Sequence, residues 1–234
     1  MPKVTSILIT RPKLDAIPLA EKLSNLGYAP LVWPLIEIQN RPAPQGLSVQ
    51  EEDVYAFTSA NGVRAASAAK LPVRCAFAVG PATLEACHQA GYPAQAATGD
   101  VASLVALISA AKPTGRILHI SGRDLAGDLC ASLTSRDLRA ENIPLYAAEA
   151  QSQMPQEIHM ALTQSNIDAV MLYSKRTASI FCQHMQDSLM IDRLNKTHFL
   201  CLSAAVAETL ISAGYQNCQV AKTPTETALL ELLL

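Results

Sequence analysis

Three short segments of this chain occur twice, and this internal repeat constrains the fold more than any other feature. Each segment is a short apolar run that ends in small or hydroxyl-bearing residues and then enters a helix-like stretch. The pairs are residues 57–63 (FTSANGV) with 172–178 (LYSKRTA), 78–84 (AVGPATL) with 201–207 (CLSAAVA), and 9–12 (ITRP) with 120–123 (ISGR). A duplicated strand–turn–helix unit predicts two similar lobes with a cleft between them. Function is expected where the repeated turns face each other.

Apolar runs of four to six residues alternate along the chain with segments of helical periodicity. This alternation is typical of a parallel sheet with helices on its faces, so we predict an α/β fold with two doubly wound parallel sheets. Gly27, Gly91 and Gly214 each follow an expected helix and precede an aromatic residue and a new strand. Glycine in that place fits the left-handed position that ends many helices.

The long polar segment over residues 34–51 interrupts the alternation in the first half and is rich in proline. Its counterpart in the repeat begins near residue 144 and ends near residue 155. The strands expected over 31–38 and 143–149 therefore each lead into a break at equivalent places. If both breaks are crossings between lobes, one α/β domain comprises residues 1–38 plus 150–234, and the inserted α/β domain comprises residues 39–149.

The composition excludes several classes of protein. Half of the 234 residues are apolar and 16% are charged, which suits a folded core, and a formal net charge of −2 provides no basic surface for nucleic acid. The apolar runs are too short to span a membrane and no signal peptide is apparent, so we expect a cytoplasmic protein. The six cysteines form no CxxC pair and the five histidines are scattered, which predicts free thiols and no metal site.

The candidate binding residues lie in the turns between strands and helices. In open α/β sheets ligands bind at the carboxyl ends of the strands, where helix N-termini favour anions. The candidates are Thr10, Arg11, Thr58, Ser59, Asn61, Gly80, Thr83, Gly122, Arg123, Ser174, Lys175, Arg176 and Ser203. Together these turns suit a ligand that bears several carboxylates or phosphates. The alternative for each single turn is plain N-capping by Ser, Thr or Asn.

Motifs for covalent or nucleotide chemistry are absent from the sequence. It contains no P-loop, no G-x-G-x-x-G fingerprint and no G-x-S-x-G elbow. His119 lies in the middle of an expected strand, where a buried sheet position is a better interpretation than a general base. Tyr146 lies near a crossing between lobes and could present its phenol to the cleft. Catalysis by this chain would therefore depend on positioning and electrostatics.

The order of these motifs resembles the uroporphyrinogen-III synthase family over nearly the whole chain. The segments that carry the resemblance are 9–12 (ITRP), 34–38 (PLIEI), 57–63 (FTSANGV), 78–80 (AVG) with Thr83, Gly122, Tyr146, Tyr173 with Ser174, and 202–214. The resemblance implies two flavodoxin-like domains joined by a two-stranded β-ladder, with the active site in the cleft between them. It also implies cyclisation of hydroxymethylbilane to uroporphyrinogen III, with loss of water and inversion of ring D, without a cofactor.

The resemblance also assigns roles to individual residues. Tyr146 matches the tyrosine that is proposed to assist or orient the leaving hydroxyl, and Ser59, Thr83 and Ser174 match polar cleft residues. The family often has a threonine in the last turn, where this chain has Ser203-Ala204-Ala205, so a side-chain role at that turn is in doubt.

Two other functions fit the same residues. One is a non-catalytic two-lobed binding protein for a small polycarboxylate or other polyanion, and the other is a degenerate synthase kept as a partner module. The expected partner is a linear tetrapyrrole with eight carboxylates, with neither nucleic acid nor membrane. We expect a monomer that makes at most a transient contact with the enzyme that supplies hydroxymethylbilane.

Overall fold

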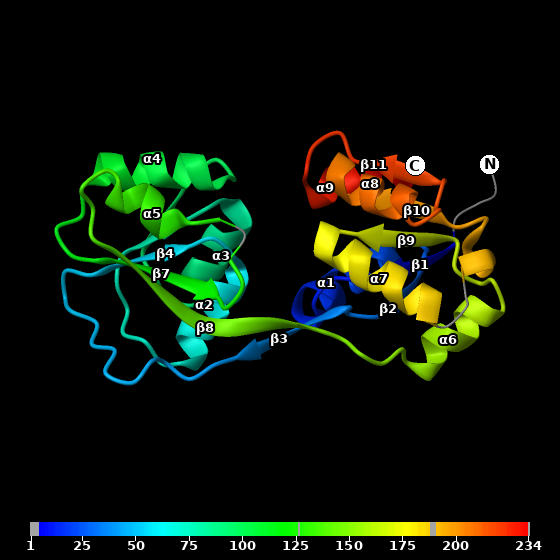
Figure 1. Ribbon diagram of the computed structural model, residues 1–234, viewed down its shortest axis with the longest axis horizontal. Coiled ribbons are helices and arrows are strands. Elements are labelled where there is room, and N and C mark those ends of the chain that lie inside the picture. Colours follow the sequence, from blue (N-terminus) through cyan, green and yellow to red (C-terminus); the bar gives the residue numbers. More distant parts are fainter. Residues whose placement is uncertain (1–4, 126, 188–190, 234) are drawn as a thin grey trace. The chain divides into compact units, whose positions relative to one another are not determined.

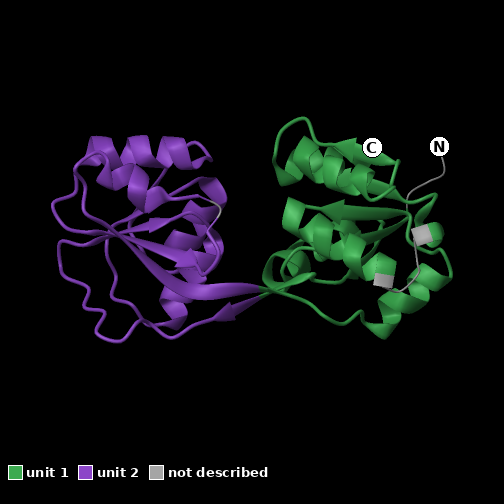
Figure 2. Ribbon diagram, viewed as in Figure 1, with its two compact units in different colours: residues 1–37, 149–234 green, residues 38–148 purple. Residues whose placement is uncertain are grey.

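The computed structural model describes residues 5–125, 127–187 and 191–233. These residues form two compact units, each of which is described by itself (Figure 2). Unit 1 comprises Met1–Glu37 and Glu149–Leu234, and unit 2 comprises Ile38–Ala148. No helix in the described part of the chain combines the length and the hydropathy that crossing a bilayer requires.

Unit 1 is a five-stranded parallel sheet with helices on both faces (Figure 1). Its strands are β1 (Ser6–Ile9), β2 (Ala29–Val32), β9 (Ala169–Leu172), β10 (His198–Cys201) and β11 (Cys218–Val220). Its helices are α1 (Lys13–Asn25), α6 (Gln156–Thr163), α7 (Lys175–Asp187), α8 (Ala204–Ser212) and α9 (Glu226–Leu230), with short 3-10 helices at Ile191–Leu194 and Glu231–Leu233. The spatial order β2-β1-β9-β10-β11 is the flavodoxin-like order 2-1-3-4-5.

The two faces of this sheet bury alternate residues of the same strands. On one face Val170 and Leu172 pack with α6, α7 and α8, whereas on the other Ala169 and Met171 pack with α1 and α9. This alternation is the period of two that a strand imposes on its side chains, and burial on both faces explains why the strands read as continuous apolar runs.

Unit 2 is a six-stranded sheet in the order β3-β8-β7-β4-β5-β6. Its strands are β3 (Ile36–Asn40), β4 (Val54–Phe57), β5 (Ala76–Ala78), β6 (Ala94–Ala96), β7 (Ile117–Gly122) and β8 (Ala140–Ala150). Its helices are α2 (Ala60–Ala68), α3 (Pro81–Gln89), α4 (Val101–Ala111) and α5 (Leu129–Thr134). Helices α2 and α3 cover one face of the sheet, and α4 and α5 cover the other.

The sequence repeat corresponds to equivalent places in the two sheets. Strands β8, β7, β4, β5 and β6 lie in unit 2 in the same order as β2, β1, β9, β10 and β11 in unit 1. Each repeated segment therefore joins equivalent elements: β4 to α2 as β9 to α7, and β5 to α3 as β10 to α8. Along the chain, unit 2 runs β4, β5, β6, β7 and β8, whereas unit 1 begins with β1 and β2, the equivalents of β7 and β8, and continues with β9, β10 and β11. The two units are therefore circular permutants of one arrangement.

The predicted α/β fold is confirmed. The left-handed conformation predicted for three glycines is confirmed as well, since φ is +87° at Gly27, +81° at Gly91 and +99° at Gly214. The strand predicted over 31–38 is wrong as a single element, because β2 ends at Val32 and β3 begins at Ile36. Pro34 lies between them and has no N–H for a ladder. Strand β3 is the neighbour of β8 in the sheet of unit 2, and the ladder that joins two domains stays a prediction.

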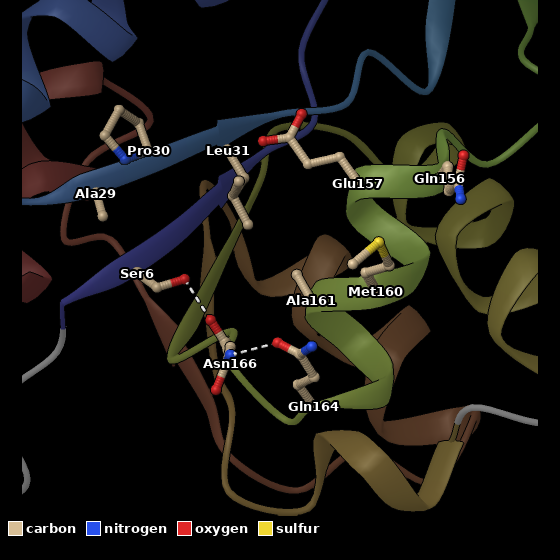
Figure 3. Close-up of a pocket in the computed structure, with 10 residues that line it drawn as sticks. All are labelled: Ser6, Ala29, Pro30, Leu31, Gln156, Glu157, Met160, Ala161, Gln164 and Asn166. Carbon is tan, nitrogen blue, oxygen red and sulfur yellow. Dashed lines mark hydrogen bonds between the residues drawn. The ribbon is translucent and has the colours of Figure 1, made fainter.

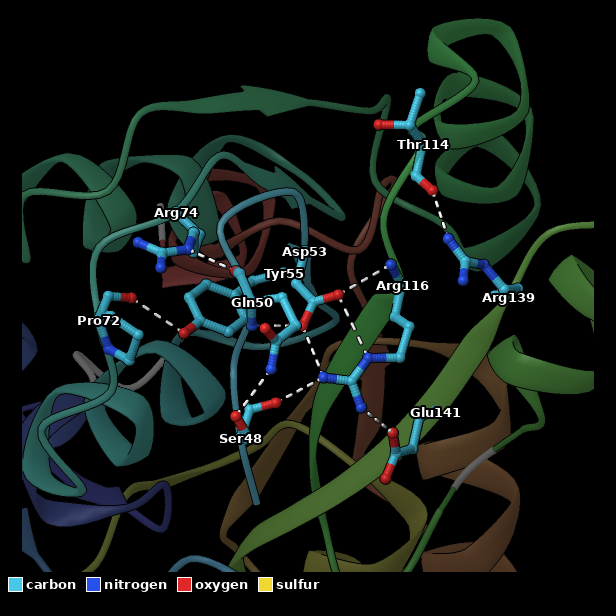
Figure 4. Close-up of polar contacts among 10 residues, drawn as sticks. All are labelled: Ser48, Gln50, Asp53, Tyr55, Pro72, Arg74, Thr114, Arg116, Arg139 and Glu141. Carbon is cyan, nitrogen blue, oxygen red and sulfur yellow. Dashed lines mark hydrogen bonds and ion pairs between the residues drawn. The ribbon is translucent and has the colours of Figure 1, made fainter. Parts of the chain in front are cut away.

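The polar segment before β4 is held to unit 2 by a buried carboxylate (Figure 4). Asp53 is 3% exposed and accepts hydrogen bonds from the backbone N–H of Gln50 at 2.8 Å and of Arg116 at 2.9 Å. The guanidinium of Arg116 approaches the same carboxylate to 2.7 Å and also pairs with Glu141 at 3.0 Å. These contacts lie at the amino ends of β4, β7 and β8, opposite to the turns that carry the candidate residues.

Candidate functional site

The candidate residues fall into two groups, one at the carboxyl edge of each sheet, because the carboxyl ends of parallel strands meet at one edge. Unit 1 carries Thr10, Arg11, Ser174, Lys175, Arg176 and Ser203. Unit 2 carries Thr58, Ser59, Asn61, Gly80, Thr83, Gly122, Arg123 and Tyr146. The structure brings each group together within its own unit, and the cleft between the units stays a prediction.

Tyr146 lies on β8 opposite Gly122, where the register shifts: Ser121 pairs with Pro144 and Gly122 with Tyr146, so β8 has one extra residue at this place. A Cβ atom at Gly122 would be 3.0 Å from Cε2 and 3.2 Å from Cζ of Tyr146, so the ring lies directly over the glycine. The phenol is within hydrogen-bonding reach of the Ser59 side chain and the Gly122 backbone. Burial raises the pKa of Tyr146 and those hydrogen bonds offset only part of the rise. The phenol is therefore a neutral hydrogen-bond donor at neutral pH.

Capping by a side chain distinguishes the duplicated turns. Ser59 Oγ accepts the N–H of Asn61 at 3.2 Å in front of α2, and Ser174 Oγ accepts the N–H of Thr177 at 3.1 Å in front of α7. Gly80 and Ser203 occupy the same place in front of α3 and α8, and neither helix has a side-chain cap. Plain capping therefore accounts for one equivalent pair of helices. The other pair, α3 and α8, has no side-chain cap. Helix α3 begins with Pro81, which has no N–H, and in α8 the N–H of Val206 bonds to the carbonyl of Ser203 at 3.1 Å. The remaining first-turn N–H groups and the positive dipole end of each helix suit a carboxylate.

Thr83 lies in the first turn of α3 and is 5% exposed. Its hydroxyl has no hydrogen-bond partner among the residues that the structure describes. Its counterpart in α8 is Val206, which is 1% exposed. Threonine and valine have similar shapes, and a hydroxyl in threonine takes the place of a methyl group in valine. At the position in unit 1 that is equivalent to Thr83, the chain therefore has an apolar residue of similar shape. Thr83 therefore stays a candidate, since no described residue uses its hydroxyl.

Several candidates are already engaged inside their unit. Thr10 is fully buried and donates to the carbonyl of Met171 at 2.6 Å, so its hydroxyl is not available to a ligand. Thr58 Oγ1 lies 3.1 Å from Nε2 of His119. Asn61 Oδ1 accepts from Arg64 at 2.9 Å. His119 is 3% exposed, which confirms its interpretation as a buried sheet residue.

The charged candidates differ in their surroundings. Arg11 stacks 4.7 Å above the ring of Tyr173 and pairs with Glu226 at 2.7 Å, so its charge is largely balanced within unit 1. Arg123 pairs with Asp124 at 3.3 Å. The side chains of residues 175 and 176, Lys and Arg, are exposed at the start of α7. Sequence reasoning missed the ion-pair partner of Arg11, Glu226. Its only sequence signal was an acidic residue in the first turn of α9, far along the chain from Arg11.

A pocket between β2 and α6 of unit 1 lies away from these turns (Figure 3). Its lining includes Ser6 and Ala29, which begin β1 and β2, and Met160 of α6. None of the candidate residues lines it. This pocket is therefore not the candidate site.

Two α/β units of permuted flavodoxin-like order, each with the candidate turns at the carboxyl edge of its sheet, place the chain in the class of duplicated two-unit α/β proteins. The family model described as uroporphyrinogen-III synthase HemD matches residues 17–231, so the chain belongs to the uroporphyrinogen-III synthase family. No curated protein matches the chain significantly.

Solved structures share the fold of this chain. Uroporphyrinogen-III synthetase from Helicobacter pylori superposes with a TM-score of 0.67 at 15% identity, covering 97% of each chain. A mutant uroporphyrinogen III synthase from Thermus thermophilus gives a TM-score of 0.56 at 18% identity, covering 97% of this chain and 96% of the other. At these identities the likeness establishes the fold, and the family follows from the family model.

Proposed function

We propose that the chain cyclises hydroxymethylbilane to uroporphyrinogen III, as a lyase that needs no cofactor. The observation that carries this proposal is the family match over residues 17–231. Family membership favours this activity over the alternative of a non-catalytic polyanion-binding protein. The enzyme would act in porphyrin biosynthesis, and we propose a cytoplasmic monomer that receives its substrate from the hydroxymethylbilane-producing enzyme.

Tyr146 is the residue to which we assign the leaving-group step. The reaction needs loss of the ring-A hydroxyl as water, after which the azafulvene carbon is attacked by the substituted carbon of ring D through a spiro intermediate. A neutral phenol can donate a hydrogen bond to the departing hydroxyl. A tyrosine is neutral at pH 7 at its ordinary pKa, and burial raises the pKa of Tyr146 further. The ring that carries this phenol packs directly over the backbone of Gly122.

The uncapped helices α3 and α8 are the groups to which we assign the substrate carboxylates. Each presents first-turn N–H groups without a side-chain cap. Binding several carboxylates at fixed places would fold the linear tetrapyrrole so that closure occurs at the substituted carbon of ring D. Uncatalysed closure gives the other isomer, so this control of conformation is a main part of the catalytic work.

The test is an isomer assay with enzymatically generated hydroxymethylbilane. Products are oxidised to porphyrins and the type I and type III isomers are separated by chromatography. We expect type III to dominate with the protein present and type I without it. Type I alone, formed at the rate of the protein-free control, would refute the proposal. A rise in the unfolding temperature with polycarboxylate but no type III product would instead support the binding protein, since ligands of the native state stabilise it.

A further inference from the structure

The sheet of unit 1 has an open edge at β2. Strand β2 pairs with β1 on one side, and no strand within residues 5–125, 127–187 and 191–233 pairs with its outer side. At the equivalent edge of unit 2, β8 is covered by β3. An open edge offers unpaired N–H and C=O groups to other chains, which is why proteins protect such edges with proline or charge.

The hydrogen bonds to β1 show which groups of this edge face outward. Three odd-numbered residues donate their N–H groups to backbone carbonyls on and beside β1, at 2.8, 3.0 and 3.1 Å for Ala29, Trp33 and Leu35 respectively. Successive residues of a strand point their N–H groups alternately to its two sides. The even-numbered positions therefore face outward, and they are Pro30, Val32 and Pro34. Because proline has no N–H, Val32 carries the donor of this edge.

The two prolines lie at equal spacing on either side of Val32, which determines how this edge could pair with a second copy of the chain. In an antiparallel pair of identical strands with a two-fold axis at Val32, the two Val32 residues exchange both of their N–H···O bonds. The next bonded positions on either side place Pro30 of one copy opposite Pro34 of the other. Neither proline can donate, so the exchange at Val32 is all that remains of the ladder.

Apolar surface lies beside this edge on both faces of the sheet. The pocket between β2 and α6 is lined by Met160, which is 51% exposed (Figure 3). A second hollow, between β2 and α1, is lined by Val32 and by Ile17, which is 43% exposed. Pairing of two edges would cover part of this surface, so the missing donors are what opposes it. We propose that the outer edge of β2 is a latent self-association surface that Pro30 and Pro34 keep closed.

Replacement of the edge prolines tests this inference without any measurement of activity. The proteins are wild type, Pro30→Val, Pro34→Val, the double variant and the matched control Pro42→Val, since Pro42 is an exposed proline of unit 2. Each replaced edge proline adds a donor on both copies, and one main-chain hydrogen bond favours the paired state about fivefold. Sedimentation velocity over a concentration series should show association about 30-fold tighter in each single variant and roughly a thousandfold tighter in the double variant. Pro42→Val should behave as wild type.

Amide hydrogen exchange shows whether the edge itself forms the contact. In wild type the N–H of Val32 should exchange fast and that of Leu31 slowly, because Leu31 faces β1. In the associated double variant, Val32 should become protected. The inference is overturned if the double variant associates no more tightly than wild type or associates without protection of Val32. It is also overturned if Val32 is already protected in wild type, a measurement that decides the matter even where a variant fails to fold.

Discussion

Replacing Gly122 by alanine should disable Tyr146 without touching its hydroxyl. The new Cβ would lie 3.0 Å from Cε2 of Tyr146, whereas ordinary contacts begin at 3.4 Å, so the ring must move by about 0.4 Å. Such overpacking costs about 1–3 kcal/mol of stability. Since a misplacement of about 1 Å can lower a rate about a hundredfold, a shift of this size should lower kcat roughly five- to tenfold.

The assay is steady-state formation of the type III isomer by four proteins, namely wild type, Gly122→Ala, Tyr146→Phe and the double variant. Tyr146→Phe should slow turnover and leave the fold intact, because only the hydroxyl is lost. In that background Gly122→Ala should still lower the unfolding temperature, since the phenyl ring is still displaced. It should have little further effect on kcat, since the hydroxyl is already gone.

Gly127 provides the matched control, because a Cβ at that glycine meets no atom within 4 Å. Gly127→Ala should therefore behave as wild type in rate and unfolding temperature. The reasoning is refuted if Gly122→Ala lowers kcat by the same factor with and without the Tyr146 hydroxyl. Gly122 would then contribute to catalysis by itself, for example through its backbone N–H.

Two further predictions concern unit 2. Thr83→Val should leave the unfolding temperature within about 2 °C of wild type, because no hydrogen bond within the protein is lost and Val206 fills the equivalent place in unit 1. The same substitution should raise KM several-fold. An unchanged KM would remove Thr83 from the site. Burial alone would raise the pKa of Asp53, but hydrogen bonds from Arg116 and the backbone outweigh it and hold that pKa below 3.8. The stability contributed by Asp53 should therefore be complete above about pH 4 and fall as the pH drops further. Asp53→Asn should cost roughly 1–3 kcal/mol at pH 7 in urea unfolding and flatten this acid dependence; an equal acid dependence in both proteins would contradict the assignment.

The architecture could be predicted because it depends on local periodicity. Apolar runs such as 169–172 alternate side chains between two buried faces, and that period is visible without any contact information. The glycines at the helix ends are equally local, since a left-handed residue is a property of one position. The single strand predicted over 31–38 failed because the apolar pattern continued through Pro34, whereas the ladder could not.

The candidate site was predicted as a set of turns, and the roles within it were not. Ser59 and Ser203 look alike in the sequence, but only Ser59 caps its helix with its side chain. The two serines have nearly the same extended backbone, with φ −159° and ψ 148° at Ser59 and φ −151° and ψ 162° at Ser203, so the difference lies in the orientation of the side chain. Capping is the ordinary expectation for any serine before a helix, and only the tertiary structure separates the capped pair from the uncapped pair.

The sequence by itself determined that this chain is a duplicated α/β protein with polar and basic turns at the carboxyl ends of parallel strands. Only the tertiary structure decided which groups meet there. Gly122 lies beneath Tyr146, Thr58 is bonded to His119, and Arg11 forms an ion pair with Glu226. Each pair joins residues on different elements, and no local pattern specifies such contacts because packing of the whole sheet brings them together. The repeat therefore predicted where the candidate residues lie along the chain, and the register of the strands decided which of their side chains meet within each unit.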